Sequence, residues 1–341
     1  MPSKRTLILV VAAIGAVAVV VIAGVLIARD DPPPASGDLI AYGCKELKNP
    51  WYALCTVRPD GTEGERLTRR LPTTDPAWSP DGRRIAFTRN EDTGESTKFT
   101  HDDVFVMDAD GSDVRQLTPD KEGRSLSQPT WSPDGRQLAY VDGESVQSAV
   151  PSRYGDLFVI ADDGSGTRRL TTGPVSDPDW SPDGREVTFV RGKNLSSPTE
   201  ANDDIHVLKL ATGAARQLTR TGPGTYEAAP AWSPDGSRVA FVRWSGAWDL
   251  SGMASVNVVN RDGTGERLVV EYPNFGNSPH ALAWSPDGST IAFETPSAIG
   301  CTTIALVDVR SGDVRPLTTC ERPSESAASP AWQPDAAAKD R

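Results

Sequence analysis

Residues 75–87 read DPAWSPDGRRIAF, and this pattern returns five more times along the chain. The copies are QPTWSPDGRQLAY at 128–140, DPDWSPDGREVTF at 177–189, APAWSPDGSRVAF at 229–241, ALAWSPDGSTIAF at 281–293 and a shortened SPAWQPD at 329–335. Their tryptophans are 53, 49, 52, 52 and 48 residues apart. That period is too long for most helical repeats but suits four short strands per unit, so the spacing predicts a β-propeller.

Each unit has a second half, read as DVFVMDADGSDVRQLT at 103–118, DLFVIADDGSGTRRLT at 156–171 and DIHVLKLATGAARQLT at 204–219. The runs 85–88 and 104–107 are short, rich in β-branched and aromatic residues, and lack a helical period. Four strands per unit follow. They are a strand ending at the tryptophan (a), an IAF-like strand (b), a DVFVM-like strand (c) and an RQLT-like strand (d).

The turns explain why the same letters recur. In Ser-Pro-Asp-Gly, proline fixes φ at the first central position, and glycine adopts the left-handed conformation that redirects the chain. The Asp-Gly steps at 110–111, 163–164 and 262–263 make the next hairpin in the same way. Turns a–b and c–d share one edge of such a unit, called here the turn face, and the connections b–c and d–a share the other, the loop face.

The chain ends complement each other. Residues 38–68 supply strands b, c and d without a preceding tryptophan strand, while Trp332 ends a strand a that has no partner strands after it. Joined, the two fragments complete a sixth unit, which removes the open sheet edge that a gap in the ring would leave. We therefore predict an all-β, six-bladed propeller over residues 38–334, followed by a tail at 335–341.

These WSPDG and Asp-Gly units resemble the propeller repeats of TolB-like periplasmic proteins, and the same repeats occur in the propeller domains of prolyl oligopeptidase-type peptidases. The resemblance covers residues 38–334. It implies fold more strongly than function, because propellers host unrelated activities. It also implies an envelope interaction module without catalysis, although TolB-like proteins typically carry an additional N-terminal α/β domain where this sequence has an apolar run and a spacer.

Leu7 to Ala28 is an uninterrupted apolar run, long enough to cross a hydrocarbon core of about 30 Å. Lys4 and Arg5 precede it, so we expect residues 1–6 in the cytoplasm, a signal-anchor helix at 7–28 and the propeller outside the cell membrane. Residues 29–37, which contain DPPPASG, read as a proline-rich linker. Secretion after cleavage of the run as a signal peptide is the alternative.

Four cysteines in an exported chain suggest disulfides. Cys44 and Cys55 lie across the first hairpin, and Cys301 and Cys320 flank the last strands c and d. We predict the pairs 44/55 and 301/320. A metal site is the alternative, although no CxxC spacing or neighbouring histidine supports it.

Composition and motifs argue against several functions. The net charge of −11 disfavours nucleic acid as a partner. The three histidines, at 101, 206 and 280, fall in different units, and no GxSxG motif is present. The peptidase relatives carry their hydrolase domain on the same chain, so we expect that activity not to be inherited here. We expect no catalytic residue, no metal and no cofactor, and a monomeric propeller.

The loop face is the predicted working surface, because its connections vary while the turns repeat. Aromatic and arginine side chains in these connections are the residue types that anchor interfaces. The candidates are Arg153, Tyr154, Tyr226, Arg243, Trp244, Trp248, Tyr272, Phe275 and His280. Alanine at Trp244 and Trp248 is then expected to weaken partner capture and to leave the melting temperature nearly unchanged.

The sequence thus predicts a membrane-anchored module that binds a protein or another cell-envelope ligand. The competing hypothesis is a propeller enzyme, a lyase or glycan hydrolase, with acids at the mouth of the central channel. Because strand a is innermost, the candidates for that role are Asp75, Asp177 and Asp179. A sensor ectodomain is disfavoured because only about six residues precede the apolar run.

Overall fold

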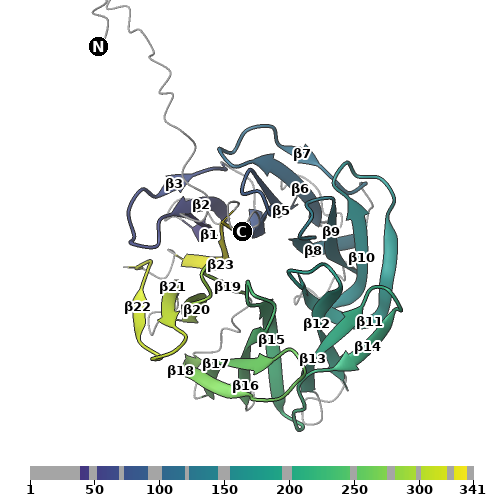
Figure 1. The fold of residues 1–341 in the computed structure, drawn as a ribbon. Helices are drawn as coiled ribbons and strands as arrows, with labels where there is room; N and C mark the ends of the chain where they lie inside the picture. The colour runs from purple at the N-terminus through teal and green to yellow at the C-terminus, as the bar shows by residue number, and fades with distance from the viewer. Residues whose placement is uncertain are drawn as a thin grey trace, which may run out of the picture. The chain divides into compact units, whose positions relative to one another are not determined.

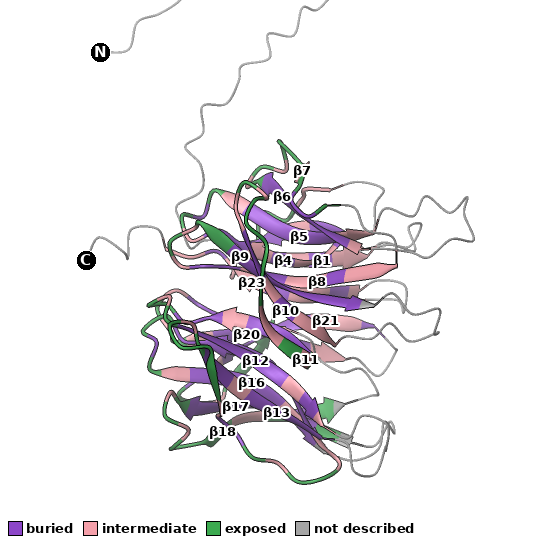
Figure 2. Ribbon diagram, turned by 90° about the vertical axis from the view of Figure 1, so that its right-hand side faces the viewer, coloured by how far each residue is buried: buried purple, intermediate pink, exposed green. Residues whose placement is uncertain are grey.

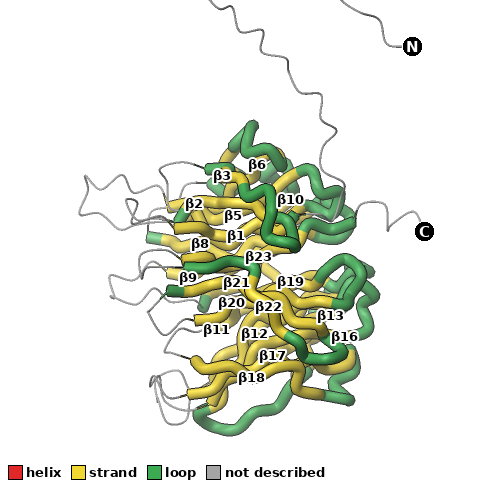
Figure 3. The backbone as a smooth tube through the Cα atoms, turned by 90° about the vertical axis from the view of Figure 1, so that its left-hand side faces the viewer, coloured by secondary structure: helices red, strands yellow, loops and turns green. Residues whose placement is uncertain are grey.

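The structure of the protein, a computed structural model, describes residues 39–45, 52–68, 73–90, 102–119, 123–144, 154–193, 202–245, 252–274, 281–296, 301–320 and 326–335. Every regular element in these ranges is a β-strand (Figure 3). The chain divides into two units, Met1–Pro33 and Pro34–Arg341, and only the second contains described residues. The described ranges contain no helix suited to crossing a membrane, and the apolar run at 7–28 lies outside them.

Three sheets are four-stranded and antiparallel, in the orders β23-β1-β2-β3, β15-β16-β17-β18 and β19-β20-β21-β22. Their strands are β1 (Ile40–Lys45), β2 (Ala53–Val57), β3 (Glu65–Arg66), β15 (Thr225–Trp232), β16 (Arg238–Ser245), β17 (Gly252–Asn260), β18 (Arg267–Asn274), β19 (Leu282–Trp284), β20 (Thr290–Pro296), β21 (Thr302–Asp308), β22 (Val314–Pro316) and β23 (Ser326–Trp332). The four strands per unit predicted from the turns are therefore confirmed for these sheets.

The remaining strands join into one larger sheet. They are β4 (Thr73–Trp78), β5 (Arg84–Asn90), β6 (Asp102–Asp108), β7 (Arg115–Gln116), β8 (Arg124–Trp131), β9 (Gln137–Glu144), β10 (Gly155–Ala161), β11 (Arg168–Trp180), β12 (Glu186–Lys193), β13 (Asn202–Lys209) and β14 (Ala214–Gln217). Two junctions merge them: the long β11 pairs with β10 through its first half and with β12 through its second, and a single parallel bridge links Asp102 to Ser125.

The sheets follow one another around a ring (Figure 1). The strands that end in the repeated tryptophans, such as β8, β15, β19 and β23, lie toward its centre, while β3, β7, β14, β18 and β22 lie outside. The exposed hairpin turns gather at one side of the ring, on the left in Figure 2. The all-β propeller predicted from the sequence is therefore confirmed.

Hydrophobic side chains fill the space between neighbouring blades, as we call the four-stranded units. The phenylalanine that ends the 13-residue repeat in four copies is among the largest of these buried side chains. Phe87, Phe189, Phe241 and Phe293 are at most 1% exposed. One cluster joins Val104 and Val106 of β6 to Trp131 of β8 and Tyr140 of β9. Because strand residues alternate between two faces, both faces of each blade are covered in this way.

Two contacts that recur in several blades join neighbouring blades. The indole N–H groups of Trp78, Trp131 and Trp284 donate to the carbonyls of Ala331, Ala77 and Ala231, at 3.2, 3.2 and 3.0 Å. Each acceptor belongs to the preceding blade. In the c–d turn, Gly111 has φ +84°, and an added Cβ would lie 2.9 Å from the Leu67 carbonyl oxygen of the preceding blade. Glycine at this position thus meets a conformational and a packing requirement together.

The two ends of the propeller meet in one sheet. β1 pairs antiparallel with β23, with Ile40 opposite Trp332 and Cys44 opposite Ala327, which confirms the predicted sharing. Next to this pairing, the Gln333 backbone N–H donates to the Leu39 carbonyl at 2.8 Å, and its side-chain amide donates to the Gly82 carbonyl at 3.0 Å. Leu39 and Gln333 therefore lie beside the Ser-Pro-Asp-Gly turn at 79–82, on the turn face.

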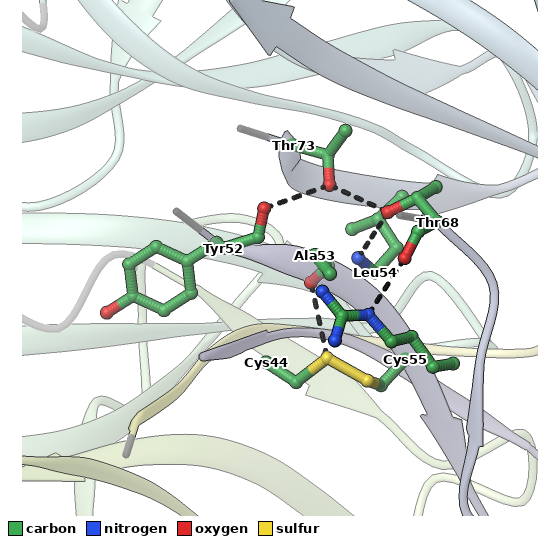
Figure 4. The surroundings of a disulfide bond; sticks show 8 residues. Cys44, Tyr52, Ala53, Leu54, Cys55, Thr68 and Thr73 are labelled. Atoms are coloured by element: carbon green, nitrogen blue, oxygen red, sulfur yellow. Dashed lines mark hydrogen bonds between the residues drawn. A yellow bond between two sulfur atoms is a disulfide. The ribbon is translucent and has the colours of Figure 1, made fainter. Parts of the chain in front are cut away.

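Both predicted disulfides are present, Cys44–Cys55 and Cys301–Cys320, and no described cysteine is free. Figure 4 shows the first beside a hydroxyl chain, in which the Leu54 N–H donates to Thr68 Oγ1 at 2.8 Å and Thr68 lies 3.1 Å from the Thr73 hydroxyl. The threonine of the RQLT-like segments accepts an equivalent bond in other blades, from Val104, Ile205 and Ile304. This bond explains why that threonine recurs.

Candidate functional site

A cavity of about 570 Å³ runs along the centre of the ring. The same segment of every repeat lines it, namely the four residues that end at the tryptophan and the proline that follows. These segments are 75–78, 128–131, 177–180, 229–232, 281–284 and 329–332. Asp75, Asp177 and Asp179, the acids predicted for the channel mouth, all lie on this wall.

The first residue of the lining segment adopts an uncommon conformation. It has positive φ in five copies: Asp75 (51°), Gln128 (56°), Asp177 (51°), Ala229 (52°) and Ser329 (52°). In each copy the register with a neighbouring strand shifts at this point, as in a β-bulge. In all five of these copies the next residue is proline, and a following proline disfavours the right-handed helical region. The bulge therefore re-aims a strained residue toward its neighbours in the ring.

Side chains at this position bond from blade to blade. Gln128 accepts a hydrogen bond from the Asp177 backbone N–H at 2.8 Å and donates its side-chain amide to the Asp177 carboxylate. The Ala229 backbone N–H donates to Asp177 Oδ2 at 3.4 Å. Asp75 accepts from the Thr88 hydroxyl at 3.3 Å and the Ser329 hydroxyl at 3.4 Å. The polar side chains thus form a connected arc along part of the ring.

Asp179 lies two residues further along its strand and bonds in the same sense. Its Oδ2 accepts from the Trp232 backbone N–H at 2.7 Å, and its Oδ1 lies 3.4 Å from the Thr130 hydroxyl. Trp232 belongs to β15 and Thr130 to β8, so this single carboxylate contacts the blades on both sides.

Removal from water perturbs two of these acids. Burial inside the ring raises the pKa of Asp75, and the charge of nearby Asp177 acts in the same direction. Burial also raises the pKa of Asp179 to about 7, against smaller opposing effects from the Trp232 N–H and the Thr130 hydroxyl. A carboxylic acid with such a pKa is partly protonated at neutral pH.

The wall is chemically one-sided. β4, β8 and the second half of β11 contribute Asp75, Gln128, Asp177 and Asp179, whereas the segments of β15, β19 and β23 contribute chiefly alanine, proline and Leu282. Gln333 and Asp335, which follow β23, also line the cavity. None of the described residues that line the cavity is a lysine, arginine or histidine. The cavity therefore offers a mainly acidic part and a mainly apolar part, a combination that favours a ligand carrying a positive group next to an apolar one.

The raised pKa of Asp179 gives a pH dependence of stability. The folded state holds this proton more tightly than the unfolded chain, so the contribution is fully present below about pH 4 and is lost as the pH rises to about 7. Asp179→Asn keeps an oxygen for the Trp232 N–H but cannot titrate. Chemical denaturation at pH 5 and pH 7.5 is expected to show wild-type stability falling relative to the variant, by at most about 1.4 kcal/mol per pH unit. Parallel pH profiles for the two proteins would contradict the assignment.

The predicted aromatic patch on the loop face is wrong for three of its members. Tyr226, Trp244 and Tyr272 are 7%, 5% and 7% exposed and belong to one hydrophobic cluster. Tyr226 and Trp244 are cross-strand partners with stacked rings 5.7 Å apart, and Tyr272 packs on Phe293 at 5.2 Å. They lie at strand ends rather than in loops, so the pleat turns them into the space between blades.

The remaining candidates divide between paired residues and residues outside the described ranges. Arg243 forms an ion pair with buried Glu227, Nη2 to Oε1 2.6 Å, and a second with Glu266. The Tyr154 hydroxyl lies 2.8 Å from both carboxylate oxygens of buried Asp203. Four further candidates lie outside the described residues: Arg153, Trp248, Phe275 and His280.

His206 lies mid-strand in β13 and stacks on Phe189 with ring centres 5.7 Å apart. Burial lowers the pKa of His206 to about 4, so the ring is neutral at physiological pH. Among the described residues, no cluster of histidines, cysteines and carboxylates has the arrangement of a metal site.

Sequence reasoning missed the other members of the channel ring, notably Gln128, Ala281 and Ser329. Each occupies the repeat position of Asp75 and Asp177. Aligning the six copies by their tryptophans and examining the column three residues before it would have found them. The charge of the acids identifies only part of the channel ring, whereas the repeat position identifies all of its members.

Four-stranded blades around a lined central channel define the protein as a β-propeller. The TolB beta propeller domain family matches residues 91–337, and the chain belongs to this family. The family assignment confirms the resemblance that the WSPDG repeats carry.

Individual relatives share shorter stretches. The chain is 34% identical over 119 residues to the Tol-Pal system protein TolB of Gluconobacter oxydans, covering 33% of this chain and 23% of that protein. It is 35% identical over 89 residues to the uncharacterized peptidase YuxL of Bacillus subtilis, covering 25% and 12%. The chain thus spans much less than two thirds of either relative. The crystal structure of TolB from Acinetobacter baumannii superposes with a TM-score of 0.67 at 18% identity, covering 89% of this chain and 68% of that one, which shows a shared fold.

Proposed function

We propose that this protein is a membrane-anchored, extracytoplasmic propeller that binds a protein or another cell-envelope ligand at its central channel and catalyses no reaction. Six blades close the ring over residues 38–334. The apolar run at 7–28 anchors the chain, the linker at 29–37 separates anchor from propeller, and the propeller acts as a monomer. The apolar sequence pattern supports the anchor. The pairings within the larger sheet support the count of six blades, because that sheet divides into three of them. These are β4–β7, β8 to the first half of β11, and the second half of β11 to β14.

One observation carries the non-catalytic assignment: the channel acids are used to hold neighbouring blades together. Asp177 accepts from the Ala229 backbone N–H, and Asp179 accepts from the Trp232 backbone N–H. Asp75 bonds to two hydroxyl groups, one of them from β23. A carboxylate committed to such bonds is poorly placed to exchange protons with a substrate. These acids still set the electrostatic potential inside the channel, which a binding site requires.

The ligand chemistry follows from the wall. Asp75, Asp177 and Asp179 lie on one side of the channel, and alanine and Leu282 predominate on the other. Because no lining residue that the structure describes is cationic, the channel suits a basic group flanked by apolar atoms. A cavity of about 570 Å³ lies within the size range of ligand pockets and accommodates a short segment of a partner chain rather than a folded domain. The rest of such a partner would lie on the loop face, because the described chain enters and leaves the propeller beside the turn face.

A propeller enzyme, a lyase or glycan hydrolase acting at the channel mouth, is the second candidate. It is favoured by Asp179, whose pKa of about 7 is in the range that general acids and bases use and whose position is on a cavity wall. The TolB and peptidase names among the relatives support neither candidate over the other.

Filling the channel tests the proposal. Ala281 lines the cavity at the repeat position that Asp75 and Gln128 occupy in other copies, so Ala281→Arg places a long cation in the channel. Ser237→Arg is the matched control on the exposed turn face, where Arg83, Arg136 and Arg185 stand at the same position in other copies. Each full-length protein is immobilised in detergent and incubated with envelope extract. We expect the wild-type protein and Ser237→Arg to retain the same amount of specific ligand. We expect Ala281→Arg to retain at least tenfold less.

Equal recovery by all three proteins, or selective loss by Ser237→Arg, would contradict binding at the channel. Comparing the captured material with that held by Asp179→Asn separates the two candidates. A binding module returns the same ligand from both proteins, whereas an enzyme returns an altered ligand from wild type and an intact one from the variant.

A further inference from the structure

The two disulfides lie on either side of one strand. β23 begins at Ser326 and pairs with β1, where Cys44 stands opposite Ala327 and is bonded to Cys55 of β2. On the other side, Cys301 immediately precedes β21, and the backbone N–H of the next residue, Thr302, donates to the Ser326 hydroxyl at 3.3 Å. The second disulfide ties Cys301 to Cys320, which follows β22. The first half of β23 therefore contacts two hairpins, each with its own covalent cross-link.

Further hydrogen bonds of this half of β23 are made by Ser329, whose backbone N–H donates to Glu294 and whose hydroxyl donates to Asp75. The sequence of β23 begins SAAS, so its side chains are too small to bury much apolar surface, and the large Trp332 comes only at the far end. Ser329 takes the strained conformation of the channel ring and interrupts the regular pairing with β1. The residues ahead of Ser329, which begin at Ser326, are thus held chiefly by backbone bonds to β1 and by the Thr302 contact. Both contacts require partner strands held in fixed positions.

We propose that the two disulfides form a redox-sensitive latch on the closure of the ring. When both are intact, β1 and β21 are fixed templates for β23. When they are reduced, the loop-face half of β23 detaches from β1 and exposes the edges of both strands, while Trp332 keeps the turn-face half in place. This inference concerns ring closure and does not depend on the proposed ligand.

The chemistry requires a thiol reductant, either a small dithiol or the active-site dithiol of a thiol–disulfide oxidoreductase. Its thiolate attacks one sulfur, the S–S bond breaks and a mixed disulfide forms; its second thiol then displaces the remaining cysteine. Each latch disulfide yields two protein thiols and one oxidised dithiol. Attack is expected at Cys320, Cys44 or Cys55, which are partly exposed, rather than at Cys301, which is 1% exposed.

Hydrogen exchange of the full chain in detergent, with and without dithiothreitol, tests the latch. Reduction is expected to increase amide exchange at least tenfold in peptides covering 40–45 and 326–329, with less than a twofold change in β12 and β13 on the opposite part of the ring. Unchanged exchange at 40–45 and 326–329, or a similar increase in every blade, would overturn the proposal.

Variants assign the effect to each cross-link. Cys44→Ser with Cys55→Ser, and Cys301→Ser with Cys320→Ser, are each expected to raise exchange at 326–329 partway toward the reduced value. The protein with all four changes is expected to match reduced wild type and to be insensitive to dithiothreitol. A response of the four-serine protein to dithiothreitol, or wild-type exchange in both paired variants, would show that the disulfides do not act on β23.

Discussion

Deletion of residues 328–341 is expected to abolish a single cooperative unfolding transition. It removes Trp332 and most of β23, so β1 loses its partner, and the indole of Trp78 loses its acceptor at the Ala331 carbonyl. The edge of β1 that β23 covers then faces solvent unpaired. We expect a loss of about 5 kcal/mol or more, comparable to the whole stability of a typical domain, together with aggregation. Thermal unfolding followed by circular dichroism and light scattering measures both effects.

The matched control removes only residues 336–341. It keeps β23 and Gln333, whose side-chain amide bonds to Gly82 and whose backbone bonds to Leu39. This shorter deletion is expected to melt like the full chain. Both disulfides remain in both proteins, so cross-link loss does not explain a difference. If the longer deletion also melts like the full chain, ring closure through β1 and β23 is wrong.

Trp244→Ala is expected to destabilise the protein by roughly 3 to 5 kcal/mol. Its ring is 5% exposed and stacks on Tyr226 within the cluster shared by two neighbouring blades, so truncation leaves a cavity that the surrounding strands cannot fill. Urea denaturation measures the change. This outcome is the opposite of what the sequence alone suggests, which is lost partner capture at unchanged stability.

Trp244→Phe is the control, because it keeps a ring against Tyr226 and removes less volume. It is expected to cost less than half as much as alanine. A surface role for Trp244 would instead give near-wild-type stability for both variants.

The fold was predictable because the repeated letters each perform a local task. Proline, aspartate and glycine at 80–82 specify a turn, Phe87 and its counterparts supply the core, and the tryptophans mark the inner strands. These tasks depend on neighbours in sequence or on the same position in the next blade. The number of repeats and their period therefore sufficed to predict the propeller fold. The seam followed from the unmatched fragments around Tyr42 and Trp332, and the disulfides from cysteines placed across hairpins.

The site was only partly predictable, because side-chain direction depends on strand register. Tyr226 and Trp244 fall just inside strands β15 and β16, and a boundary error of two residues was enough to turn core residues into an apparent surface patch. The strained residues of the channel were also hidden, since the bulge that re-aims Gln128 or Asp177 arises from pairing with the next strand. Asp75, Asp177 and Asp179 could be placed at the channel from the sequence, because strand a is the innermost strand of a blade. That placement requires no knowledge of strand register.

Site-specific photo-crosslinking in intact cells tests binding at the channel most directly. A photoreactive phenylalanine analogue at position 281 probes the channel wall, and the same analogue at position 237 probes the turn face. Binding at the channel requires a crosslinked product from position 281 that disappears when excess purified wild-type propeller competes, and no such product from position 237. A product from position 237 alone would place the partner on the turn face and contradict binding at the channel.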